Sequence, residues 1–105
     1  MDEKAKVQIA GEFSATELEE IIIELAKVRS GMAPAVPETP EADLDREILV
    51  QDDPLFTVRT LAGGGLRVWL RNEGTGWQAF QLSEDQRKRL AEFLNQPPGH
   101  TFTKH

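Results

Sequence analysis

The stretch RVWLRNEGTGWQAFQL, residues 67–82, constrains the fold of this chain more than any other feature. Hydrophobic and polar side chains alternate on both sides of a glycine-containing turn, which is the period of a half-buried β-strand. The same alternation occupies LFTVRTL at 55–61, and three glycines at 63–65 connect it to residues 66–71. Short strands joined by glycine turns predict an antiparallel β-meander.

Two further strands are predicted, one in front of the first helix and one, residues 47–51, as the first strand of this meander. Residues 5–13, AKVQIAGEF, alternate between hydrophobic and polar side chains, and residues 47–51, EILVQ, end at a DDP turn. The segment 5–13 leads directly into the first of two predicted helices.

Both predicted helices begin at a capping box, in which a serine and a Glu or Gln three residues later bond to each other's backbone amides. Ser14 with Glu17 starts a helix that extends to about residue 30, with Gly31 as its stop. A second box at Ser83 starts a helix through about residue 95. The element order is therefore β-α-β-β-β-β-α. Each helix has a single apolar stripe, so we expect an α+β fold in which an N-terminal β-α unit and a C-terminal helix place both helices on one face of the antiparallel sheet.

The length of 105 residues corresponds to one domain. We expect residues 1–96 to form a single α+β domain. Within it, residues 31–46 read as an acidic linker whose prolines recur every third residue, the period of a polyproline II helix. Residues 97–105 are polar and rich in turn-forming residues, which predicts a flexible tail.

Alternation also defines a candidate binding face. Because successive strand residues point to opposite sides of a sheet, Val68 and Leu70 separate from the arginines and tryptophan beside them. The apolar faces of the two strands match when Val68 lies opposite or diagonal to Phe80. Two hairpin registers around residues 72–76 meet this requirement, and the sequence does not choose between them. The opposite face is expected to present a basic and aromatic set: Arg59, Arg67, Trp69, Arg71 and Trp77.

Arginine and tryptophan are enriched among binding hot spots, and arginine over an indole ring forms a cation–π contact. These residues predict a small non-enzymatic protein that recognises a protein partner, either another protein or a second copy of itself as a homodimer. Interleaved arginine and aromatic side chains also stack nucleic-acid bases, so a single-stranded nucleic-acid-binding module is the alternative. If instead the protein itself covers this face, both tryptophans are structural.

The charge distribution suggests a second alternative. Residues 1–53 contain five basic and fourteen acidic residues, for a net charge of −9, whereas residues 54–105 contain seven basic and four acidic residues, for +3. The acidic half is either a solvated surface or a docking surface for a basic partner, as in acidic inhibitors that mimic the charge of DNA.

Other functional classes are not expected. Cysteine is absent, which excludes disulfides and thiolate chemistry, and the two histidines lie in the tail, so neither a metal site nor a cofactor is expected. The glycine run lacks the lysine and helix of a phosphate-binding loop, and no catalytic motif is present. No apolar run is long enough to span a bilayer and the N-terminus does not resemble a signal peptide, so we expect no membrane association and a cytoplasmic location.

The final strand and helix, GWQAFQLSEDQRKRLAEFL, form a pattern that resembles the single-stranded-DNA-binding coactivator family known as positive cofactor four. The resemblance covers about residues 47–95 and implies four antiparallel strands followed by an amphipathic dimerisation helix. The chain departs from that family in being acidic and in having an additional strand and helix in front.

Overall fold

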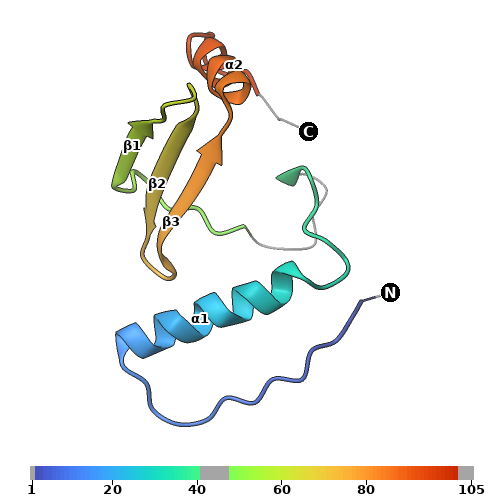
Figure 1. The fold of residues 1–105 in the computed structure, drawn as a ribbon. Helices are drawn as coiled ribbons and strands as arrows, with labels where there is room; N and C mark the ends of the chain where they lie inside the picture. The colour runs from blue at the N-terminus through green and yellow to red at the C-terminus, as the bar shows by residue number, and fades with distance from the viewer. Residues whose placement is uncertain (1, 41–47, 102–105) are drawn as a thin grey trace. The chain divides into compact units, whose positions relative to one another are not determined.

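The computed structural model describes residues 2–40 and 48–101, and the chain divides into two compact units. One unit contains the N-terminal segment and a helix, and the other contains a three-stranded sheet and a second helix (Figure 1). The α+β class and the antiparallel sheet predicted from the sequence are confirmed. That residues 1–96 form one domain stays a prediction.

The helix of the first unit is α1, Ala15–Ser30, and it begins where the capping box predicts. Ser14 Oγ accepts a hydrogen bond from the Glu17 amide at 3.1 Å, and Glu17 Oε1 accepts one from the Ser14 amide at 3.0 Å. These two bonds satisfy amides that have no partner inside the helix. The helix ends at Gly31, whose amide donates to the Val28 carbonyl at 3.2 Å.

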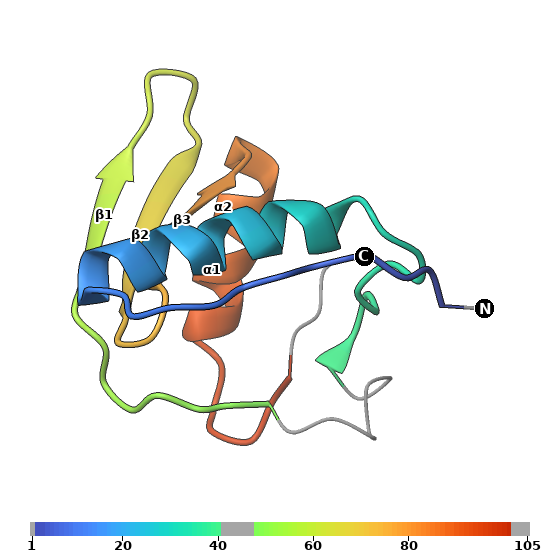
Figure 2. The same ribbon diagram turned by 90° about the horizontal axis from the view of Figure 1, so that it is seen from below.

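The predicted strand at 5–13 does not belong to any sheet in the described residues. The segment instead runs extended alongside α1 (Figure 2). Residues 48–51 of the other predicted strand are also outside the sheet, and residue 47 lies outside the described residues. A period-2 pattern specifies which side chains share a face, but a strand also requires a neighbouring backbone with which to pair.

The second unit is built on a sheet of three strands: β1, Phe56–Thr60; β2, Leu66–Asn72; and β3, Gly76–Leu82. Their spatial order is β1-β2-β3, so three consecutive strands of the predicted four-stranded meander are present. β1 and β2 are antiparallel, with Val58 opposite Val68. The sheet therefore has three strands, where five were predicted along the chain.

Two glycine turns connect these strands. Between β1 and β2, the Leu61 amide donates to the Gly65 carbonyl and the Gly64 amide donates to the Leu61 carbonyl, each at 2.9 Å. Gly64 has a φ of 89°, a conformation that residues with a Cβ rarely adopt. The second turn comprises residues 73–75, between the end of β2 and the start of β3.

The second helix, α2, spans Glu84–Leu94 and follows β3 directly. Ser83 is its N-cap, and its hydroxyl accepts a hydrogen bond from the Gln86 amide at 3.2 Å. Arg87 Nη1 donates to the Gly64 carbonyl at 2.9 Å, which connects the start of α2 to the turn between β1 and β2.

Hydrophobic side chains in both units remain accessible. None of the described residues is a fully buried hydrophobic residue, and Phe56 and Phe80 on the sheet are 67% and 54% exposed. No described helix combines the length and apolar character needed to cross a bilayer.

Candidate binding face

The register of β1 and β2 brings the predicted basic and aromatic residues together. Arg59 lies opposite Arg67, and Thr57 lies opposite Trp69. Residues directly opposite each other in an antiparallel ladder project from the same face, as do residues two apart on one strand. Thr57, Arg59, Arg67 and Trp69 therefore share one face, here called the Arg/Trp face, and the apolar Val58 and Val68 project from the other.

Two arginines lie close to one indole on this face. The guanidinium carbon of Arg59 is 5.8 Å from the ring centroid of Trp69, and that of Arg67 is 5.7 Å from it. Like charges directly opposite each other destabilise a strand pair. Each cation–π contact offsets this repulsion by about 0.5–1 kcal/mol at an exposed site. Trp69 thus allows two positive charges to occupy neighbouring positions.

A third strand fixes the direction of one guanidinium. Arg67 Nε and Nη2 both donate to Gln81 Oε1 on β3, at 3.0 and 2.7 Å. This contact favours the register in which Val68 is opposite Phe80, because those residues immediately follow Arg67 and precede Gln81. The Arg67 side chain therefore contacts Gln81 on β3 and Trp69 on its own strand, β2.

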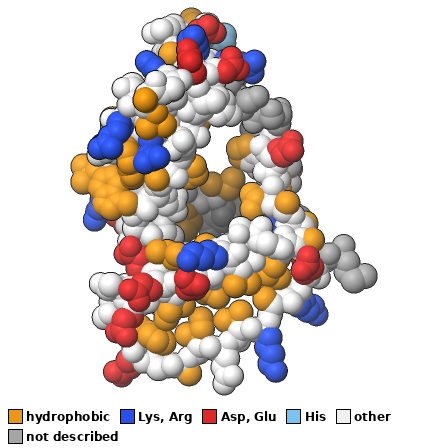
Figure 3. Space-filling view, viewed as in Figure 1, with side chains coloured by type: hydrophobic (Ala, Val, Ile, Leu, Met, Phe, Trp, Pro, Cys, Tyr) orange, Lys and Arg blue, Asp and Glu red, His pale blue; other side chains and the backbone are white. Residues whose placement is uncertain are grey.

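A small hollow of about 250 Å³ lies on the Arg/Trp face, lined by Thr57, Arg59, Trp69 and Trp77. Ligand pockets typically have volumes of about 300–1,000 Å³, so this hollow accommodates a side chain or a base better than a cofactor. Trp77 is 53% exposed, whereas Trp69 is half-buried. Figure 3 shows hydrophobic and basic side chains gathered on the side of the sheet where β1 lies.

Arg71 is separate from this hollow. Its amide donates to the Leu55 carbonyl at 2.9 Å, and its carbonyl accepts from Gln51 Nε2 at 3.0 Å. The Gln51 side chain also accepts from the Glu73 amide at 3.0 Å. Of the five candidates, Arg59, Trp69 and Trp77 line the hollow, Arg67 supports Trp69, and Arg71 adds an exposed charge further along β2.

Alternation in the sequence already assigns two polar residues to this face, Thr57 with Arg59 and Gln81 with Trp77, although neither is among the five candidates. Gln51 was missed, since no periodic pattern relates it to residues 71–73, to which it bonds.

Among residues 2–40 and 48–101, no group of three or more His, Cys, Asp or Glu side chains could hold a metal ion. Within the same residues, carboxyl groups with a lowered pKa occur at the starts of the two helices. Hydrogen bonds from Ser14 lower the pKa of Glu17, and a hydrogen bond and charge interaction with Lys88 lower the pKa of Glu84. Both are exposed and belong to the helices.

Comparison with protein-family models, with curated proteins and with solved structures found no match to this chain. The resemblance to the positive cofactor four family therefore gains no support from them, and the functional argument rests on the geometry of the Arg/Trp face.

Proposed function

We propose that this protein is a non-enzymatic binding module whose Arg/Trp face recognises a protein partner. The observation that carries the proposal is the pair of arginines whose guanidinium carbons lie 5.8 and 5.7 Å from the Trp69 ring centroid, next to a hollow that Trp77 also lines. Indole and guanidinium groups provide large contact areas and charge-assisted hydrogen bonds, and this is why they dominate binding hot spots.

The geometry favours a particular partner chemistry. An apolar side chain fits the hollow, and carboxylates on either side of it would meet Arg59 and Arg67. Because Gln81 and Trp69 already hold Arg67, little side-chain entropy is lost when a partner binds. The proposal includes the helix arrangement expected from the sequence, in which both helices lie on the apolar side of the sheet and leave the Arg/Trp face open.

Single-stranded nucleic acid is the second candidate, since Trp69 and Trp77 line the same hollow and aromatic side chains stack bases. Two considerations make nucleic acid a weaker candidate than a protein partner. Three arginines neutralise few phosphates, and the net charge of −6 repels a long phosphate polymer.

A display library of random peptides tests the first candidate. The library is panned against the wild type and against Trp69→Ala, with Arg89→Ala as the matched control because Arg89 is an exposed arginine on α2. We expect peptides that combine acidic and apolar residues, that bind the wild type and the control, and that lose binding to Trp69→Ala. Selected peptides that bind all three proteins equally would contradict the proposal.

A titration separates the two candidates. Tryptophan fluorescence is followed while a single-stranded oligothymidylate is added at low and at high salt. We expect no change in emission. Quenching that weakens with salt and disappears in Trp69→Ala and Trp77→Ala would replace the protein partner with nucleic acid.

A further inference from the structure

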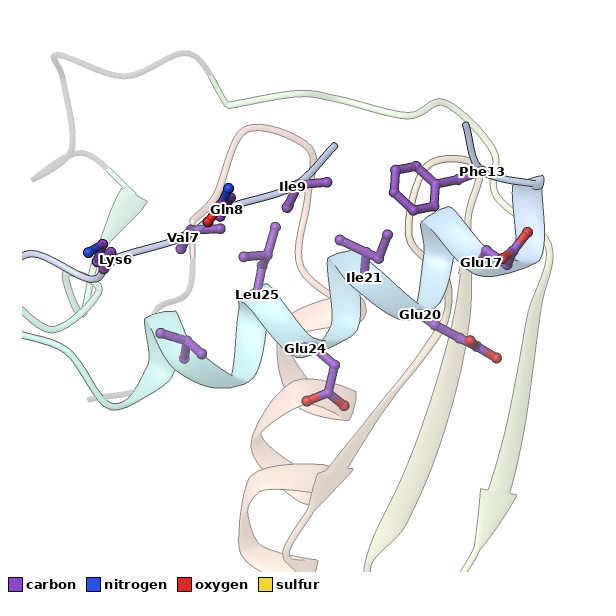
Figure 4. A pocket seen from close by; sticks show the side chains of 11 residues that line it. Lys6, Val7, Gln8, Ile9, Phe13, Glu17, Glu20, Ile21, Glu24 and Leu25 are labelled. Atoms are coloured by element: carbon purple, nitrogen blue, oxygen red, sulfur yellow. The ribbon is translucent and has the colours of Figure 1, made fainter. Parts of the chain in front are cut away.

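The N-terminal unit contains a larger groove than the Arg/Trp face does. Its volume is about 650 Å³, and it lies between the segment 5–13 and α1. In Figure 4, Val7, Ile9 and Phe13 point toward Ile21 and Leu25 of the helix. The helix side of the groove also includes glutamates, of which Glu20 and Glu24 point away from the segment.

The two ends of the N-terminal segment are fixed. At one end the Glu3 amide donates to the Ala33 carbonyl at 2.9 Å, and Glu3 Oε1 accepts from the Ala33 amide at 3.0 Å. At the other end, Ser14 and Glu17 form the cap of α1. The extended conformation between these points therefore has anchors on both sides.

The backbone between these anchors is unpaired. Among the described residues, the amide and carbonyl groups of 5–10 make no backbone hydrogen bond. An extended segment with free backbone groups is a template for the addition of another strand. Residues 6–9 of this segment line the groove.

The apolar side chains along this groove are only partly covered. Val7 is 53% exposed, Ile9 is 48%, and Val28 at the far end of α1 is 49%. Figure 3 shows a row of hydrophobic side chains between α1 and the N-terminal segment, with acidic side chains over α1. The apolar side chains between segment and helix are thus about half covered, and their exposed surface is available to another apolar surface.

We infer that the occupant of this groove is the N-terminal segment of a second copy of the chain, paired antiparallel with the first. A second copy has the required pattern, because its Val7 and Ile9 project to one side and its Lys4 and Lys6 to the other. The segment is also complementary to itself in charge, since Lys4 at one end and Glu12 at the other have opposite signs. In a twofold pair each segment fills the other copy's groove. Both copies use the same edge of the segment, so the contact is closed and does not propagate into a polymer.

The alternation and the charges select a register. Placing Gln8 opposite Gln8 of the partner subunit keeps all apolar side chains on the helix side and sets Val7 opposite Ile9 of the partner subunit. The same register brings Lys4 near Glu12 of the partner subunit at each end of the ladder. Gly11, with a φ of 124°, ends the regular ladder at Ala10, so the side chains of Lys4 and Glu12 meet just beyond its last pair.

The oligomeric state of the full chain is the first test. Sedimentation velocity across the micromolar range is expected to show a concentration-dependent dimer. Glu12→Lys and Lys4→Glu each change two attractive contacts to repulsive ones, so each should raise the dimer dissociation constant about tenfold. The double variant should restore it, and Lys88→Glu on α2 serves as the control that changes nothing. A wild type that is monomeric at every concentration would overturn the inference, as would a double variant no better than the singles.

The absence of cysteine permits a second test that leaves charge and apolar surface nearly unchanged. Gln8→Cys places one thiol at the twofold axis, where opposed strand residues are close enough for a disulfide. We expect mild oxidation to yield a covalent dimer many times faster than for Lys88→Cys. Equal rates of covalent dimer formation for the two variants would show that any association uses another surface and would contradict the inference.

Discussion

Gly65 provides the sharpest test of the sheet. A Cβ at this position would lie 2.6 Å from the Leu82 carbonyl oxygen, whereas ordinary contact begins at 3.4 Å, so alanine requires a displacement of about 0.8 Å. The obstacle is backbone at the end of β3, which cannot rotate away as a side chain can. Overpacking of this kind costs about 1–3 kcal/mol.

The neighbouring Gly63 is the matched control, since a Cβ there meets nothing within 4 Å. Gly63→Ala should be neutral or stabilise the protein by up to about 1 kcal/mol, because alanine reduces the entropy of the unfolded chain. Both substitutions add the same methyl group to the same turn. They differ only in what that methyl group meets.

Urea and thermal denaturation followed by tryptophan fluorescence measure the difference, because both tryptophans belong to the sheet. Each kcal/mol corresponds to about 4–8 °C in Tm for a unit of this size. Gly65→Ala should therefore unfold at least several degrees below Gly63→Ala. Equal stability of the two variants would refute the packing of the turn between β1 and β2 against the end of β3.

Three further predictions concern the helices. Ser14→Ala should destabilise α1 by about 1 kcal/mol, measured by circular dichroism during urea denaturation, since the helix loses its N-cap. The hydrogen bonds from Ser14 lower the pKa of Glu17, so the stability that its carboxylate contributes is present above the ordinary pKa of a glutamate and is lost as pH falls through the lowered pKa. Acidification should therefore reduce the helical signal of the wild type more than that of Glu17→Gln. Lys88→Ala should leave the denaturation midpoint within measurement error, because its ion pair with Glu84 is exposed, and a clear shift would contradict this.

The features that were predicted correctly from the sequence are those specified by local rules. The caps at Ser14 and Ser83 depend on residues three positions apart, and the structure confirms both helix starts. Alternation along β2 placed Arg67 and Trp69 on one face, and the glycine run placed the turn before them. These rules act within a few residues, so no knowledge of the remaining chain is required.

The features that were missed depend on contacts between distant residues. Residues 5–13 have the pattern of a strand, but their backbone finds no partner in the described residues, and a sequence pattern does not reveal a missing neighbour. Gln51 bonds to both Arg71 and Glu73 across about twenty residues of chain, which no local signal announces. The hairpin register was left open because apolar matching permitted two solutions, and a side-chain contact between Arg67 and Gln81 favours one of them.

The position of β1 at the edge of the sheet has a consequence for colloidal behaviour. Its outer edge has no neighbouring strand in the described residues, and Leu55 and Phe56 at its start are 65% and 67% exposed. Hydrophobic edge strands seed aggregation unless a charge interrupts them. Arg59 is the only charged residue in the run LFTVRTL, so it acts as a gatekeeper for this edge. Replacing it with an apolar residue should therefore increase the aggregation rate of a concentrated solution.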